Sequence, residues 1–342
     1  MADYSRIISK TLSPSQWTDV NESSILAPYT YLTSAPSKET LRHLANALND
    51  WLRVESTQLE LIIRMAQALQ NDSLLFDDIE DGSELRRGQP VANTVYGVPQ
   101  TVNAASYVVI KVYKDASELS GIMKDNASIK VSSTPEEIIT EELLNAHRGQ
   151  GMDILWRDQV TCPTEDEYID MIKNKTASLF KILMRLMMAC ATERKNVYAS
   201  HAVSDRHWTY FTDLGTHRNY IPLIELIGVM YQIRDDYSNL RDASYSDTKG
   251  FAEDLTEGKF SFPLVHAIRA DESNTRLLDI IRQHPKSPEL KREALLYMEN
   301  ESKSFDYTLA VLRALQIRID EEMKALGGNP KLEKLLDKLR VK

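Results

Sequence analysis

Hydrophobic side chains recur at helical spacing along most of the chain. Near its N-terminal end they fall three or four positions apart, at Leu41, Leu44, Leu48 and Leu52. This period places them on one face of a helix. The same period continues from about residue 55 to residue 80, which predicts a second and longer helix.

Capping signals support the helices that follow. Thr134 precedes Pro135, the order expected at a helix start, and Thr164 with Glu167 forms a capping box. No secondary structure is predicted for the polar residues 193–219, and residues 243–259 are expected to form a loop. Further helices are predicted at about 100–122, 134–157, 166–192, 222–240, 260–271, 274–284, 288–301 and 303–326.

The scarcity of turn residues favours an all-α fold. The 342 residues include 12 Gly and 12 Pro, about half of the usual shares of roughly 7% and 5%. Residues 1–36 are expected to form a loose N-terminal segment with at most a short helix. Residues 37–342 contain no repeat and no linker, so they are predicted to form a single helical domain.

Charge and cysteine content exclude several classes of protein. The net charge of −9 argues against nucleic-acid binding, which needs a basic surface. No apolar run is long enough for a transmembrane helix, and the first residues lack the apolar stretch of a signal peptide. Two cysteines, Cys162 and Cys190, are too few for a disulfide framework or a four-cysteine zinc site. A reducing, cytoplasmic location is therefore expected.

A dense acidic cluster ends the helix predicted at 55–80. Asp77, Asp78 and Asp81 are followed closely by Arg86 and Arg87. Asp77 and Asp81 share a helix face, about 6 Å apart along the axis, where two carboxylates repel by about 3 kcal/mol at an effective dielectric of about 20. Mg²⁺ binds one or two carboxylates together with phosphate oxygens. Acids beside arginines therefore indicate a Mg²⁺–diphosphate site.

A second acidic pair repeats this arrangement. Asp235 and Asp236 end another mostly apolar helix, one turn after Gln232, and two lysines, Lys249 and Lys259, flank an acidic loop downstream. Each of these groups alone could be a solvated helix end or loop. Two acidic clusters that end two apolar helices instead favour metal ions at the mouth of an apolar cleft. The lysines would then contact diphosphate oxygens as point charges.

Together these residues resemble the trans-isoprenyl diphosphate synthase family, and within it the fungal type of geranylgeranyl diphosphate synthase. The similar phrases occur in family order between about residues 27 and 320. They are Leu74 to Asp81, Leu85 to Gly88, Gly97 to Thr101, His147 to Gly151, Trp156 to Asp158, Asn174 to Thr176, Gln232 to Tyr237 and Lys249 to Pro263.

The resemblance implies an all-α isoprenoid synthase bundle (class I terpenoid) around a central cavity, usually as a homodimer. It implies three Mg²⁺ ions that hold an allylic prenyl diphosphate. Asp77 and Asp81 would bind two of the ions and Asp235 the third, with Asp78 and Asp236 in support. The implied ligands of the allylic diphosphate are Arg86, Lys175, Lys249 and Lys259, with Gln232 near the same site. The implied catalytic residues are the three metal ligands together with Asp78, Lys175 and Gln232.

The site for the second substrate, isopentenyl diphosphate, departs from the family pattern Gly-Lys-x-x-Arg. Lys38 matches, but Ser37 replaces Gly and Leu41 stands where Arg is expected. Arg42 is one position late, about 100° around a helix, and would serve only if the helix start shifted.

The rest of that site is present, since Gln70 takes a His/Gln position and Arg87 follows the acidic cluster. Loss of one charged hydrogen bond costs about 1.5–3 kcal/mol. Condensation would be weakened without being abolished.

The presumed chain tunnel also departs from the family. Asp72 stands five residues before Asp77, where a small or aromatic residue normally sets product length, with Ser73 and Phe76 beside it, and Lys111 lies on the next helix. Because an isolated buried charge is costly, one hypothesis pairs Asp72 with Lys111 inside the tunnel. The alternative is that both point to solvent or to a dimer surface.

Three functions are compatible with this sequence. The first is elongation: condensation of an allylic diphosphate with isopentenyl diphosphate to a C20 product. The second is a terpene cyclase on the same scaffold, which ionises farnesyl or geranylgeranyl diphosphate without isopentenyl diphosphate. The third is a non-catalytic regulatory subunit, which the complete metal and diphosphate set argues against. Base rates within the family place elongation first.

Overall fold

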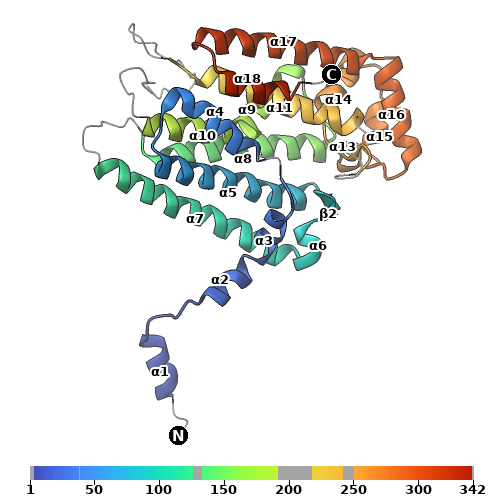
Figure 1. Cartoon of the computed structure of the whole chain (residues 1–342). Coiled ribbons are helices and arrows are strands. Elements are labelled where there is room, and N and C mark those ends of the chain that lie inside the picture. The colour runs from blue at the N-terminus through green and yellow to red at the C-terminus, as the bar shows by residue number, and fades with distance from the viewer. Residues whose placement is uncertain (1–3, 38, 126–132, 192–217, 242–249, 341–342) are drawn as a thin grey trace.

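The computed structural model describes residues 4–37, 39–125, 133–191, 218–241 and 250–340. Within these ranges the chain is a bundle of helices, with one short antiparallel hairpin of β1 (Leu85–Arg86) and β2 (Gln89–Pro90) (Figure 1). The all-α fold expected from the sequence is confirmed. No described helix is both long and apolar enough to cross a membrane.

The helices differ widely in length, from 5 to 28 residues. In chain order they are α1 (Ser5–Leu12), α2 (Asp19–Ile25), α3 (Ala27–Ser34), α4 (Thr40–Leu52), α5 (Ser56–Glu80), α6 (Ala92–Tyr96), α7 (Val98–Asp125), α8 (Pro135–Gln159), α9 (Glu165–Lys175), α10 (Ala177–Cys190), α11 (Ile221–Arg241), α13 (Glu253–Glu257), α14 (Phe262–Ala270), α15 (Arg276–Ile281), α16 (Pro288–Asn300), α17 (Ser304–Ala325) and α18 (Pro330–Asp337).

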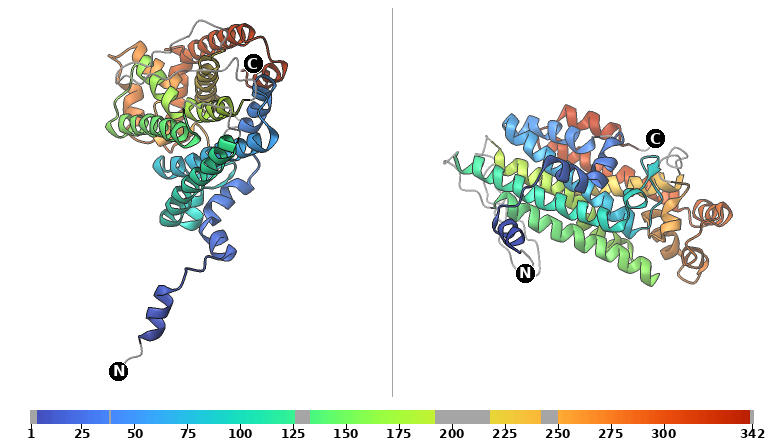
Figure 2. Two further views of the ribbon diagram at one scale, coloured as in Figure 1. Left: turned by 90° about the vertical axis from the view of Figure 1, so that its left-hand side faces the viewer. Right: turned by 90° about the horizontal axis from the view of Figure 1, so that it is seen from below.

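Helix α5 packs against several other helices of the bundle. It packs against α7 on one side and against α4 and α10 on the other, while α10 also contacts α8 and α11 (Figure 2). Helix α10 is buried over most of its surface, as its Leu- and Met-rich sequence requires. Burial of each large apolar side chain contributes about 1.5–3 kcal/mol, so these contacts fix the position of the C-terminal end of α5.

Two glycines allow helices to approach closely beside this end. A Cβ at Gly149 would lie 2.3 Å from the backbone nitrogen of Lys175, so α8 and α9 can touch only because this residue has no side chain. A Cβ at Gly228 would lie 2.6 Å from the Cβ of Ala177, which imposes the same condition on α10 and α11. The first contact brings Asp153, one turn after Gly149, next to Lys175.

Three details differ from the expected elements. The helix expected at 166–192 is divided at Thr176, whose hydroxyl bonds to Gln232 of α11. Helices α6, α13 and α18 were not expected. The N-terminal segment holds three short helices, of which α1 lies apart from the bundle while α3 packs on α5 and α7. The division of the chain at residue 36 stays a prediction.

Candidate active site

The first acidic cluster occupies the last turn of α5, where it meets cations from several elements. Arg86, at the end of β1, donates from Nε to Asp78 Oδ1 at 2.7 Å and from Nη2 to Asp77 Oδ2 at 3.0 Å. Asp78 is almost fully buried. Burial would lower the pKa of Arg86, but the two carboxylates outweigh it and raise that pKa. Arg86 therefore stays charged between them.

Lys175, the last residue of α9, reaches the same cluster. Its Nζ donates to Asp153 Oδ2 at 2.7 Å and lies 3.5 Å from Asp77 Oδ1. Burial would lower the pKa of Lys175, yet Asp153 and Asp77 raise it. Burial would likewise raise the pKa of Asp153, and Lys175 with Lys259 lowers it. The two groups are held as an ion pair.

Asp81 completes the cluster one turn after Asp77. Its Oδ1 accepts a hydrogen bond from Arg157 Nη1 at 2.9 Å, and Lys259 Nζ lies 3.9 Å from its Oδ2. No described group donates a hydrogen bond to this buried Oδ2. Burial and the charge of Asp77 raise the pKa of Asp81 to about 7. A positive ion near this oxygen would stabilise its charged form.

The second acidic pair has two different roles in the structure. Asp236 is buried and accepts hydrogen bonds from Tyr168, from Gln232 Nε2 at 2.8 Å and from the backbone nitrogen of Phe262 at 2.7 Å. These contacts tie α11 to α9 and α14. Asp235 is half-buried; its role as a metal ligand, and the catalytic role of Gln232, stay predictions.

The residues around the first cluster fit a divalent metal. No group of three or more His, Cys, Asp or Glu side chains is arranged around one point in the described ranges, and Arg86, Lys175 and Arg157 contact the carboxylates of this cluster. Even so, Asp77 and Asp81 lie on one helix face, and the unbonded Asp81 Oδ2 is the kind of oxygen that Mg²⁺ binds.

Arg87 occupies the turn of the hairpin. The turn consists of Arg87 and Gly88, both with positive φ (56° and 76°), as in a type I′ turn. Asn, Asp or Gly is usual at the first position, and an arginine there costs about 1–2 kcal/mol. Arg87 Nη1 donates to the carbonyl oxygen of Leu32 and Nη2 to Asn71 Oδ1, each at 3.1 Å.

The other predicted residues of the isopentenyl diphosphate site make no hydrogen bond with Arg87 among the described residues. Leu41 is buried in the core. Arg42 Nη1 donates to both carboxylate oxygens of Glu60, at 3.0 and 2.9 Å. Arg42 is therefore paired with Glu60 in this structure, and whether it serves the isopentenyl diphosphate site stays a prediction. Gln70 is half-buried, and its role at the acceptor site stays a prediction. Lys38 and Lys249 lie outside the described residues.

The hypothesis that Asp72 pairs with Lys111 is wrong. Lys111 Nζ lies 2.5 Å from Glu22 Oε1, while Asp72 is buried and makes no ion pair with any described residue. Burial raises the pKa of Asp72 to about 8. Ser73 donates to the carbonyl oxygen of Gln70, and the ring of Phe76 packs on the apolar cluster that includes Leu32, Leu75, Ala92 and Ala105. The role of Asp72, Ser73 and Phe76 in product length stays a prediction.

The sequence reasoning gave no role to two partners in the cluster, Asp153 and Arg157. Asp153 is an isolated acid in α8, and Arg157 stands one turn later on the same face, so each could be a surface charge. Their spacing of four residues, behind a glycine that admits a close helix, is the signal that could have identified them.

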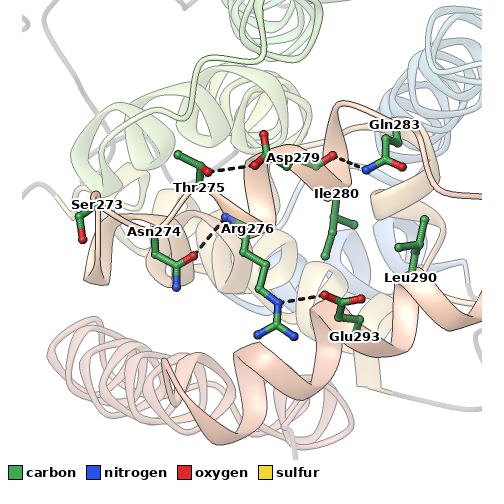
Figure 3. Close-up of a pocket in the computed structure, with 9 residues that line it drawn as sticks. All are labelled: Ser273, Asn274, Thr275, Arg276, Asp279, Ile280, Gln283, Leu290 and Glu293. Carbon is green, nitrogen blue, oxygen red and sulfur yellow. Dashed lines mark hydrogen bonds and ion pairs between the residues drawn. The ribbon is translucent and has the colours of Figure 1, made fainter.

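A surface hollow of about 690 Å³ lies elsewhere, between α15 and α16 (Figure 3). Its polar groups bond to one another: Thr275 donates to Asp279, and Arg276 donates to Glu293 at 2.9 Å. It contains no residue of the acidic clusters, so it has no part in the site described above.

Comparison of the sequence with known proteins identifies the family of this chain. The model of the polyprenyl synthetase family matches residues 22–298. The chain belongs to the polyprenyl synthetase family. It is 45% identical over 320 residues to a geranylgeranyl pyrophosphate synthase of Mucor circinelloides f. lusitanicus, covering 94% of both chains. It is 40% identical over 340 residues to a geranylgeranyl pyrophosphate synthase of Hericium erinaceus, covering 95% of this chain and 94% of that one.

Relatives with a different name are nearly as similar. An IDS-like terpene synthase of Melampsora lini is 39% identical over 338 residues, covering 99% of this polyprenyl synthetase family member and 95% of the relative. Overall identity therefore separates the two named activities poorly, and the residues of the site must be compared instead.

Proposed function

We propose that this chain is a Mg²⁺-dependent prenyltransferase that condenses an allylic prenyl diphosphate with isopentenyl diphosphate, giving a trans-prenyl diphosphate of about C20. One observation carries the proposal: the carboxylates of α5 meet Arg86, Arg157, Lys175 and Lys259, from four separate segments, at a largely buried site. The fungal relatives named geranylgeranyl pyrophosphate synthase support the product length.

Each group in the site has a proposed role. Mg²⁺, three ions in all, would be held by Asp77, Asp81 and Asp235, and when bound it stabilises the negative charge of the leaving diphosphate. The allylic diphosphate would be bound by Arg86, Lys175, Lys249 and Lys259.

The reaction needs positive charge where these residues lie. The allylic C–O bond breaks and its electron pair leaves with the diphosphate. The double bond of isopentenyl diphosphate then forms a C–C bond to the allylic carbon, and the resulting cation loses a proton to the released diphosphate. Arg86 and Lys175 are already fixed by Asp78 and Asp153, so they can stabilise the developing charge without reorganisation.

A terpene synthase is the second candidate, and the acceptor side favours it. Leu41 is buried where the family pattern has an arginine, and Arg42 is paired with Glu60. A weakened acceptor site would leave the allylic cation to cyclise or to be quenched by water. The similarity to proteins named IDS-like terpene synthase points the same way.

One assay separates the candidates. Purified protein with Mg²⁺ receives farnesyl diphosphate, with and without isopentenyl diphosphate, and the products are identified by mass spectrometry. We expect a longer diphosphate only when isopentenyl diphosphate is present. Hydrocarbon or alcohol without it would reject pure elongation. If no product forms under either condition but the protein increases the activity of an added active synthase, the protein is a regulatory subunit.

We also propose a homodimer. Helix α7 exposes apolar side chains, including Val102 (37% exposed) and Ile110 (64% exposed). Exposed apolar groups on one long helix are typical of a protein–protein contact. Light scattering during size-exclusion chromatography tests this, and a monomer at micromolar concentration would reject it.

A further inference from the structure

Arg87 differs from the described cations around the first acidic cluster. Arg86 beside it contacts two carboxylates, whereas Arg87 has no carboxylate within ion-pair distance among the described residues. Its two acceptors, the Leu32 carbonyl and the Asn71 side-chain oxygen, are neutral. Burial and the charge of Arg86 lower the pKa of Arg87. Its positive charge therefore has no ion-pair partner among the described residues, with only the more distant Asp78 acting on it. A half-buried cation in this position favours an anionic ligand.

The Asn71 amide is oriented toward Arg87. Its Nδ2 donates to the Gln67 carbonyl oxygen at 2.9 Å, so Oδ1 must face the guanidinium. Tyr29 of α3 lines the same hollow as Asn71, and α3 also supplies the Leu32 carbonyl. Helices α5 and α3 thus hold Arg87 from two sides. A guanidinium has five N–H donors, and these contacts leave several for a ligand.

A hollow of about 580 Å³ reaches Asn71, the partner of Arg87, although Arg87 itself does not line it. Its lining includes Tyr29, Thr33 and Ser37 on the N-terminal side, and Gln67 and Asn71 on α5. The charged residues that line it are Glu39, Arg42, Glu60, Arg64 and Glu118. Ser37 belongs to the sequence phrase that precedes α4 and contains Lys38. The hollow therefore joins Asn71, the partner of Arg87, to the segment in which the family pattern places its acceptor residues.

We propose that Asn71 and helix α3 position Arg87 toward the diphosphate of the acceptor, isopentenyl diphosphate, so that the N-terminal segment is part of the acceptor site. The inference rests on the proposed condensation and adds its positioning residues. It also explains why an arginine occupies a left-handed turn position, since the side-chain hydrogen bonds hold it there.

Steady-state kinetics with both substrates varied test the role of Asn71. For Asn71→Ala we expect the KM for isopentenyl diphosphate to rise about tenfold, the loss of one charged hydrogen bond. The KM for farnesyl diphosphate and kcat should stay within about twofold. Asn71→Asp places a carboxylate against Arg87 and compensates its charge, so the KM should rise further. If Asn71→Asp is closer to wild type than Asn71→Ala, Asn71 is only structural and the proposal is overturned.

Two tyrosines of α3 provide a matched pair. Tyr29 lines the hollow together with Asn71, whereas Tyr31 does not line it and its Oη donates to the Pro90 carbonyl oxygen at 2.9 Å. Both rings pack on the same apolar cluster. We expect Tyr29→Phe to raise the KM for isopentenyl diphosphate about threefold and Tyr31→Phe to leave it unchanged. Equal effects would remove α3 from the acceptor site.

Calorimetric titration with isopentenyl diphosphate alone separates this inference from the proposed function. A wild-type protein that binds isopentenyl diphosphate but forms no longer product contradicts the condensation, and the same variants then test the inference through Kd. A wild-type protein that does not bind it overturns the inference directly.

Discussion

The two sides of α5 differ in how their charges are compensated. At its C-terminal end, Asp77, Asp78 and Asp81 contact Arg86, Arg157 and Lys175 within 2.5–3.5 Å. On the side that faces α3, the buried Asp72 has no described ion-pair partner, and Arg87 has only neutral acceptors. On the proposed allylic side the charged groups are paired within the fold, whereas on the proposed acceptor side neither Arg87 nor the buried Asp72 carboxyl has an ion-pair partner among the described residues.

The difference has a physical consequence for each side. Paired buried charges hold one another in place, so the allylic side is preorganised before any substrate arrives. An uncompensated buried charge costs free energy that a ligand of opposite sign can recover. The acceptor side should therefore depend on its ligand and on single residues more visibly than the allylic side does.

The largest expected effect is the loss of turnover when a proposed metal ligand on the allylic side is replaced. Asp77→Ala removes a proposed metal ligand and one acceptor of Arg86, and we expect turnover to fall by at least about three orders of magnitude. Asp235→Ala should do the same if Asp235 binds the third metal. Product formation from farnesyl and isopentenyl diphosphate measures both.

Asp158→Ala is the matched control. Asp158 accepts from Arg157 Nε at 2.9 Å, but its side chain is 61% exposed. It should retain near-wild-type turnover, since exposed pairs contribute little. Substantial activity in Asp77→Ala, or an equal loss in Asp158→Ala, would contradict the assignment of the cluster.

The second prediction concerns Arg87. Arg87→Asn places a residue that favours a left-handed turn at φ 56°. The relieved backbone strain, about 1–2 kcal/mol, should offset the lost hydrogen bonds to Leu32 and Asn71, each worth about 1 kcal/mol. We expect an almost unchanged melting temperature and an increase of about a hundredfold in the KM for isopentenyl diphosphate. A fall in melting temperature with an unchanged KM would show that Arg87 serves the fold.

Much of this fold could be predicted from the sequence, because the apolar period of long helices is a strong local signal. The break at Thr176 could not, since no Gly or Pro marks it. It depends on the approach of α11, where Gly228 meets Ala177 and Thr176 bonds to Gln232. Helix α18 is short, so its apolar period is a weak signal. Its buried residues, Leu332 and Leu336, lie on a helix that packs against α4, which is distant in the sequence.

The candidate site was predictable to a similar extent. Clustered acids such as Asp77 and Asp81 carry a signal of their own, and so do paired arginines. Asp153 and Arg157 do not, because an acid and a base four residues apart also suit an exposed helix face. The failed pairing of Asp72 with Lys111 has the same cause: Glu22, the actual partner of Lys111, lies 89 residues away in the N-terminal segment.

The third prediction tests the uncompensated carboxyl. Burial raises the pKa of Asp72 to about 8 in the folded state, against about 3.9 when unfolded. The native state then keeps a proton that the unfolded chain has released, so the stability from this group is full below about pH 4 and is lost as pH rises through about 8. Between pH 6 and 8 we expect a loss of about 2 kcal/mol.

Asp72→Asn removes this titration. Urea unfolding at pH 6 and pH 8 should show a smaller loss for the variant than for wild type. Asp50→Asn, at an exposed carboxylate paired with Lys331, is the control and should follow wild type. Parallel pH dependence in wild type and Asp72→Asn would mean that Asp72 is ionised in the folded protein. Asp72 would then no longer support the contrast between the two sides of α5.

The smallest expected effect concerns Arg42, which stands one position after the missing arginine. Its guanidinium is held by both oxygens of Glu60, and Glu39 lies 3.7 Å away. Because these acids already compensate its charge at the surface, Arg42→Ala should change the KM for isopentenyl diphosphate by less than about twofold. Glu60→Gln frees the guanidinium and serves as the converse test. A tenfold loss in Arg42→Ala would show that Arg42 leaves Glu60 for the substrate, and the acceptor side would then need no help from Arg87 and α3 to explain its binding.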